Sequence, residues 1–304
     1  MDRNINISYC FFSRTAKFLG SGGVIFVSGS TYSMIANNSM FYNCSCSGSG
    51  GAIHVVCSNS YLRMICAHRC SCSSLGHFAE IKATQANQVE YLSVSFCSHS
   101  TSGYHPIYIE SGNQRVDKTN SSMNNADMAS GIRIWFPYTI TSSHCTFSNN
   151  FVSDKICIWF HSDSITSTMS FCNIIHNNSP SGHGVVFFQG GGFKKLMYCI
   201  LRNNQNCLFY VQSGSFELSH SFIDHSSSSF SISTAVSTEN NNSFFYRITY
   251  QIQFFDSHHC NADIPFPLRT LDMTVLVQKQ MNTINQNHMR SFYLFFTITL
   301  LMIV

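Results

Sequence analysis

The chain has 304 residues, of which 44% are apolar and only 10% are Asp, Glu, Lys or Arg, and its formal net charge is +3. A charge this small, with no run of Lys or Arg, argues against a nucleic-acid partner. Polarity comes from Ser, Asn, Thr and His, a composition that favours strands and polar turns over helices, because Ser and Asn compete with a helix for backbone hydrogen bonds.

The first residues, 1–9, include Asp2 and Arg3 and lack an apolar segment, so we expect no secretory signal there. The 14 cysteines contain no CxxC pair, which disfavours structural zinc. Two interpretations of the cysteines remain open. They are small buried apolar side chains, or they form disulfides in an oxidising compartment.

An internal repeat runs from the first residues to about residue 260. Apolar residues open successive units at steps of about 22 to 29 residues, a spacing typical of solenoid proteins. They are Phe12, Phe41, Cys70, Phe96, Met123, Phe147, Phe171, Ile200 and Phe222. A short apolar strand closes each unit, at 24–27, 52–55, 78–81, 107–109, 132–135, 156–159, 185–188, 208–211 and 230–232.

A third apolar segment lies in each unit, for example at 61–65, 89–92 and 193–197. Three short strands cannot enclose a core alone, but stacked coils can, because each strand pairs with its equivalent in the next coil. The sequence therefore predicts an all-β protein in which residues 1–260 form a single-stranded parallel β-helix of about nine coils.

Asparagine follows the apolar opening of several units at a constant offset. Met40 precedes Asn43, Phe147 precedes Asn150, Ile174 precedes Asn177 and Ile200 precedes Asn203. Asn tolerates the left-handed conformation of a sharp corner, and stacked Asn side chains can hydrogen-bond along the coil axis. We interpret these residues as structural corners.

The pattern changes after Cys260. A Pro-containing segment and a polar stretch make 261–290 a linker, and 291–304 is a hydrophobic tail. Its last 13 residues carry no charge, although a spanning helix needs about 20. We expect this tail to associate the protein with a membrane, as a short anchor or as a lipid-anchor signal. A last hydrophobic strand is the alternative.

Two motifs identify a family resemblance. Gly50-Gly51-Ala52-Ile53 matches the GGA(I/L/V) motif, and Phe147 to Asn150 matches the FxxN motif, of the chlamydial polymorphic outer membrane proteins. The chain also resembles the related, expanded family of trichomonad parasites. The resemblance implies a right-handed β-helix at the cell surface with a role in adhesion. The implied partner is a host-surface protein or a glycan.

Two tryptophans are candidate ligand-facing residues. Trp135 and Trp159 are 24 residues apart, which predicts the same place in adjacent strands. A stacked pair outside the coil could bind sugar rings, but an aromatic ladder that stabilises the solenoid is the favoured interpretation.

Catalytic features are weak. The 14 acidic residues are scattered; Asp127 and Asp154 sit at different offsets in their units, and Glu80 and Glu110 flank equivalent strands one register apart. His258-His259-Cys260 is the densest potential metal cluster, but adjacent strand residues point to opposite faces.

We therefore expect no catalytic residue, cofactor or metal. The favoured function is a non-enzymatic, membrane-associated surface or adhesion protein. The alternatives are a carbohydrate-active β-helix enzyme, either a polysaccharide lyase or a glycoside hydrolase, and a decayed family member without function.

Overall fold

The structure is a computed structural model that describes residues 3–98, 103–153, 155–163, 165–180 and 183–224, and the backbone of strands at 230–232 and 237–241. These residues belong to one compact unit, Met1–Asp263. The predicted linker at 261–290, the tail at 291–304 and the His258–Cys260 cluster lie outside the described residues. Among the described residues, no helix has the length and apolar character needed to cross a membrane.

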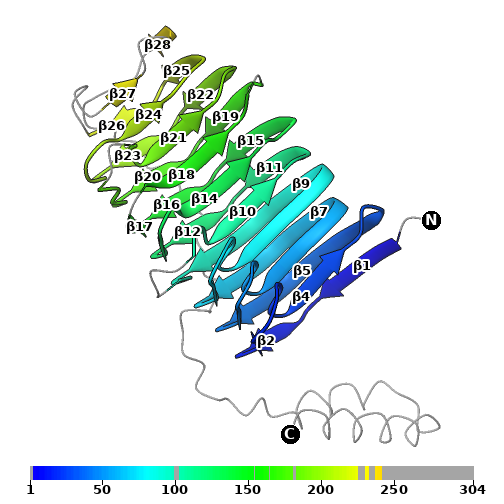
Figure 1. The fold of residues 1–304 in the computed structure, drawn as a ribbon. Coiled ribbons are helices and arrows are strands. Elements are labelled where there is room, and N and C mark those ends of the chain that lie inside the picture. Colours follow the sequence, from blue (N-terminus) through cyan, green and yellow to red (C-terminus); the bar gives the residue numbers. More distant parts are fainter. Residues whose placement is uncertain are drawn as a thin grey trace, which may run out of the picture. The chain divides into compact units, whose positions relative to one another are not determined.

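Parallel strands stack in chain order to form a β-helix, as the repeat predicts (Figure 1). The stack has about seven turns, slightly fewer than the predicted nine. At the ends of the described stack, β1 (Arg3–Ser8) and β27 (Phe230–Ile232) each pair with a described strand on one side only.

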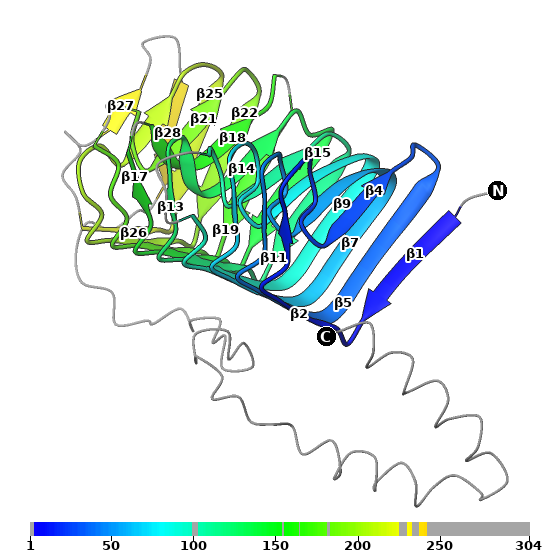
Figure 2. The ribbon, with the colours of Figure 1, turned by 60° about the horizontal axis from the view of Figure 1, so that its bottom comes forward.

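Three long ladders of paired strands run along the stack (Figure 2). The first ladder contains β4 (Ile25–Ser28), the starts of β7 (Ile53–His68) and β9 (Ala79–Ser95), β10 (Ile107–Glu110), β14 (Ala129–Trp135), β18 (Ile156–His161), β21 (Val186–Gln189), β24 (Phe209–Val211) and β27.

The second ladder contains β1, β5 (Tyr32–Tyr42), the middle of β7 and β9, β11 (Asn113–Asp117), β15 (Thr139–Ser143), β19 (Ser167–Ser170), β22 (Phe193–Met197), β25 (Ser215–Ser219) and β28 (Ser237–Asn241).

The third ladder contains β2 (Phe11–Ser13), the ends of β5, β7 and β9, β12 (Asn120–Ser122), β16 (Thr146–Ser148), β20 (Asn173–Ile175), β23 (Ile200–Arg202) and β26 (Phe222–Ile223). Short strands pair at the remaining corner, namely β3 (Ala16–Lys17), β6 (Ser45–Cys46), β8 (Ser71–Cys72), β13 (Asn125–Ala126) and β17 (Phe151–Val152).

Alternate residues of the strands point inward and form one continuous apolar core from Ile25 to Ile223. The GGA(I) motif shows how a turn feeds this core. Gly50 has φ +68°, and a Cβ on Gly51 would collide with the carbonyl oxygens of His77 and Ser71 in the next turn. Ala52 and Ile53 then enter the core fully buried, as does Phe147 of the FxxN motif.

The predicted asparagine ladder is present at the corner that follows the third ladder. Side-chain Nδ2 atoms donate to Oδ1 of the next turn from Asn124 to Asn150 (3.3 Å), from Asn150 to Asn177 (3.1 Å) and from Asn177 to Asn204 (3.1 Å). The predicted offset was one residue wrong for Asn43 and Asn203. These two residues hold the left-handed corner position just before the ladder, with φ of 51° and 53°.

Cysteines continue the same line in the earlier turns. Backbone hydrogen bonds place Cys44, Cys70, Cys97 and Asn124 at equivalent positions of successive turns. In each case, the N–H of the residue that follows one member donates to the carbonyl oxygen of the member one turn earlier. Of the cysteines in the described chain, twelve form no disulfide and most of these are buried, whereas Cys66 is disulfide-bonded. Burial raises the pKa of Cys57 to about 11 and that of Cys72 to about 12, which keeps these thiols neutral and unreactive. They behave as small apolar side chains.

Candidate binding surface on the first ladder

Two rows of side chains point outward from the first ladder. The covered row is buried despite facing out, and consists of Glu80, Tyr108, Arg133, Trp159 and Phe187. The open row lies two residues further along each strand and is half-buried; it consists of Lys82, Glu110, Trp135, His161 and Gln189.

Loops that lead into the strands explain why the covered row is buried. His105 stacks on Tyr108 with ring centroids 5.6 Å apart, and His183 lies 5.9 Å from Phe187. Ala129, Ile156, Trp159 and Phe187 form a second apolar cluster, separate from the core inside the coil, and Met128, Trp135 and Tyr210 pack against it. The surface therefore rests on a packed layer outside the sheet.

Arg133 lies at the centre of this layer, 9% exposed. Its guanidinium carbon is 3.8 Å from the ring centroid of Trp135 and 4.0 Å from that of Trp159. The Nη1 group donates to Nε2 of His105 at 2.9 Å, so Nε2 acts as the acceptor. Burial lowers the pKa of Arg133 to about 10 and holds the pKa of His105 well below its usual range. At neutral pH this is a charged guanidinium beside a neutral imidazole.

The predicted equivalence of Trp135 and Trp159 is wrong. Trp159 pairs in register with Arg133, and Trp135 pairs with His161, because paired residues of β14 and β18 are 26 residues apart here, whereas the two tryptophans are 24 apart. The indoles meet edge to face, 5.5 Å apart at 86°. Trp159 is 6% exposed and half-buried Trp135 belongs to the open row, so only Trp135 is placed to offer a ring to a ligand.

Charged side chains at the start of the open row pair with one another. The Nζ atom of Lys82 lies 3.0 Å from Glu80 and 3.2 Å from Glu110, and Nδ1 of His54 lies 2.8 Å from Glu80. Burial alone would raise the pKa of Glu80, but hydrogen bonds from His54 and Lys82 outweigh burial, and the pKa lies below its usual value. The Glu80 and Glu110 carboxylates lie out of register with each other, which confirms the prediction, yet both form an ion pair with Lys82.

Neighbours fix the other polar groups of the open row. The Tyr108 hydroxyl donates to Glu110 at 3.0 Å, and burial is the main reason that the pKa of Tyr108 is raised. The indole Nε1 of Trp159 donates to Oε1 of Gln189 at 3.1 Å. Nε2 of His161 lies 3.2 Å from Asp163. The open row is therefore an ordered array of polar and aromatic groups.

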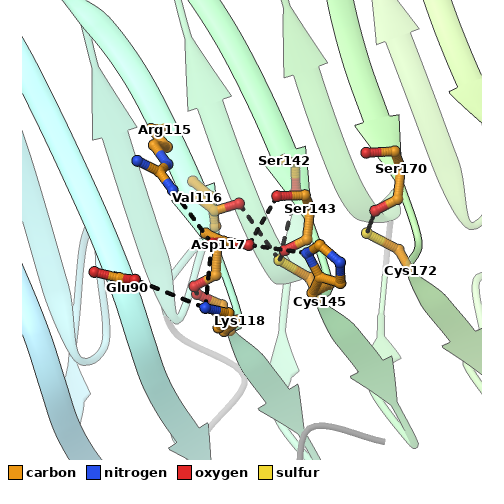
Figure 3. A network of polar contacts seen from close by, with 12 residues as sticks. Glu90, Arg115, Val116, Asp117, Lys118, Ser142, Ser143, Cys145, Ser170 and Cys172 are labelled. Atoms are coloured by element: carbon orange, nitrogen blue, oxygen red, sulfur yellow. Dashed lines mark hydrogen bonds and ion pairs between the residues drawn. The ribbon is translucent and has the colours of Figure 1, made fainter. Parts of the chain in front are cut away.

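A second polar network surrounds Asp117 on the second ladder (Figure 3). Ser143 donates to this carboxylate at 2.7 Å, and His144, Arg115 and Lys118 lie within ion-pair distance. The pKa of Asp117 is lowered, because these hydrogen bonds and charges outweigh burial. Each partner comes from the same or the next turn, so this network is interpreted as a link between turns.

The remaining candidates do not form a site. Asp127 accepts a hydrogen bond from Ser153 at 2.9 Å, and Asp154 lies outside the described residues. Within the described part of the chain, no three His, Cys, Asp or Glu side chains are placed to hold a metal ion.

Comparison with known proteins gave no match to a family model, to a curated protein or to a solved structure. The fold and the surface on the first ladder are therefore the starting points for function.

Proposed function

We propose that the protein is a non-enzymatic, membrane-associated surface protein of the adhesion type, which binds its partner through the open row. One observation carries the binding proposal. Polar and aromatic side chains from successive turns are held in fixed orientations by buried neighbours, and such preorganisation reduces the entropy lost on binding. The membrane and surface locations rest on the uncharged tail and on the resemblance to the polymorphic outer membrane proteins.

A test in the native cell addresses location and attachment together. An epitope tag after Met1 should be stained on intact cells, and cells without the protein should attach less well to the surfaces that they colonise. Expression of the Trp135→Ala variant should not restore attachment, whereas Ser28→Ala, an exposed residue at the far end of the first ladder, should restore it. Staining only after permeabilisation would overturn the surface role.

A carbohydrate-active enzyme is the second candidate, because Glu80, Lys82 and Glu110 bring two carboxylates and a cation together on one face. A general acid needs a raised pKa, and that of Glu80 is lowered. We expect no new reducing ends or unsaturated products when the full-length protein is incubated with polysaccharides. Turnover that Glu80→Gln abolishes would establish the enzyme instead.

A further inference from the structure

The geometry points to an uncharged polysaccharide as the ligand of the open row, lying along the solenoid axis with one sugar unit for each turn. This inference rests on the proposed function and specifies its ligand. It follows from the charges of the surface, from the orientation of its polar groups and from the spacing of the turns.

The charged side chains of the open row already contact partners within the chain. Lys82 lies between the carboxylates of Glu80 and Glu110, and His161 lies beside Asp163. Arg133 is buried between indole rings. A charged ligand would have to compete with these pairs or lose its hydration without a new partner. A ligand with only hydroxyl groups and apolar ring faces would not have to break these ion pairs, and it would carry no charge that loses its hydration.

Groups that bind hydroxyls are present in fixed orientations. Tyr108 occupies one oxygen of the Glu110 carboxylate, and Trp159 occupies the Oε1 atom of Gln189. The Glu110 carboxylate can therefore still accept hydrogen bonds from a ligand, and the Gln189 side-chain amide can still donate them. Planar polar groups held in this way suit the paired hydroxyls of a sugar, which both donate and accept.

An aromatic surface lies between these two groups. Trp135 is half-buried, and the adjacent Phe136 is 42% exposed, with its ring centroid 5.1 Å from that of Trp135. Arg133 holds Trp135 from beneath, so we interpret Arg133 as a positioning residue. An apolar sugar face can pack against this aromatic pair while its hydroxyls reach the neighbouring turns.

The spacing of the turns matches a chain of sugars. Paired strands are ~4.8 Å apart, so the open row offers a new side chain at that interval across β9, β10, β14, β18 and β21. This is close to the length of one pyranose unit in an extended polysaccharide. A ligand parallel to the axis would meet the row in register, whereas a ligand parallel to the strands would meet one or two of its members.

The experiment is affinity gel electrophoresis of the full-length protein in gels that contain a neutral glucan, a neutral mannan or the acidic polygalacturonate. At least one neutral polymer should retard the protein, and added salt should not release it. In solution, affinity for oligosaccharides of that polymer should rise with length up to about five units, one for each side chain of the open row. Intrinsic fluorescence reports this binding directly, because Trp135 and Trp159 are the two tryptophans of the chain.

Three variants make the test specific. Trp135→Ala should weaken binding by at least about tenfold, as expected for a central aromatic contact. Arg133→Lys keeps the charge but loses the planar stack, so it should weaken binding and shift the tryptophan emission. Tyr198→Ala, which removes a 40% exposed ring that stacks 5.0 Å from Phe171, should leave binding unchanged. Circular dichroism establishes that each variant is folded.

Several outcomes would overturn the inference. They are retardation by polygalacturonate alone, release by salt, an affinity that does not depend on length, or no retardation by any polymer. If cells still attach in a Trp135-dependent way when no polymer is bound, the partner is a protein and the proposed function stands. If attachment also does not depend on the protein, the proposed function fails as well.

Discussion

Lys194 is a fully buried cation inside the coil. Its Nζ group donates to the carbonyl oxygen of Ser162 at 3.1 Å, to the hydroxyl of Ser162 at 2.5 Å and to the carbonyl oxygen of Gly191. Burial lowers its pKa to about 8. Two carbonyl oxygens and one hydroxyl oxygen accept the three donors of the ammonium group, but they compensate for its lost hydration only in part.

The depressed pKa of Lys194 predicts a pH dependence of stability. The unfolded chain holds this proton up to a pH of about 10.4, whereas the folded chain loses it near pH 8. The unfolded state therefore binds more protons between these values, and the Lys194 contribution to the free energy of unfolding should rise with pH across this window, by at most about 3 kcal/mol.

Urea titrations of wild type and Lys194→Met at pH 7, 8, 9 and 10 would measure this effect. The difference between the two proteins isolates Lys194 from the buried thiols, which act in the opposite direction because the unfolded chain ionises them first. A difference that stays constant with pH would show that Lys194 is not a charged buried group.

Strands and corners stack in register, so equivalent side chains have similar surroundings in successive turns. Ile53 is an inward residue of β7 and is fully buried between its neighbours Ile25 and Ala79. A charge at this position would have no partner within the core, and water could not reach it.

Ile53→Asp should therefore destabilise the protein severely, by roughly 3 kcal/mol or more, because it buries an unpaired carboxylate. Ser28→Asp, at an exposed position of the adjacent strand β4, should change stability by less than about 0.5 kcal/mol. Thermal unfolding followed by circular dichroism compares them. Equal melting temperatures would contradict the assigned register.

The asparagine ladder allows a second test at the same scale. Oδ1 of Asn177 accepts the backbone N–H of Asn150 at 3.1 Å, and its Nδ2 atom donates to the carbonyl of Phe147 at 2.9 Å. Asn177→Ala leaves both groups buried and unpaired, which should cost roughly 2–4 kcal/mol. Asn113→Ala, at an exposed position on β11, is the matched control and should be nearly neutral in denaturant titrations.

At the largest scale, the described β-helix consists of turns that each contact only the turns next to them. Interior turns have a partner on each side, whereas β1 pairs only with β5 among the described strands. The free energy needed to open a turn should therefore be lowest at the ends of the stack.

Native-state hydrogen exchange measures this difference. Amides of β9, β10 and β14 should exchange most slowly, and those of β1 and β2 should exchange fastest. A uniform protection along the stack would instead indicate that the solenoid opens as one cooperative unit.

The sequence predicts the fold well because apolar positions recur from unit to unit, and asparagine or cysteine recurs at the corner that follows the third ladder. The surface on the first ladder is harder to predict. Paired residues of β14 and β18 are 26 residues apart beyond Ile132, whereas the two tryptophans are 24 apart, so Arg133 rather than Trp135 pairs with Trp159. The apolar pattern does not reveal this register. The loops that bury the covered row follow no periodicity. The covered row could have been found in the sequence from outward-facing residues at the same offset in successive strands, such as Glu80 and Tyr108.

Pairing between neighbouring turns also governs how such a chain can change in length. Duplication or deletion of one whole unit, between two successive members of the Asn124, Asn150, Asn177 and Asn204 series, keeps every strand in register with a new neighbour. The open row would then grow or shrink by one side chain, or ~4.8 Å, without any other rearrangement. Unequal recombination between repeats could thus alter the length of ligand that the surface accommodates while leaving the core intact.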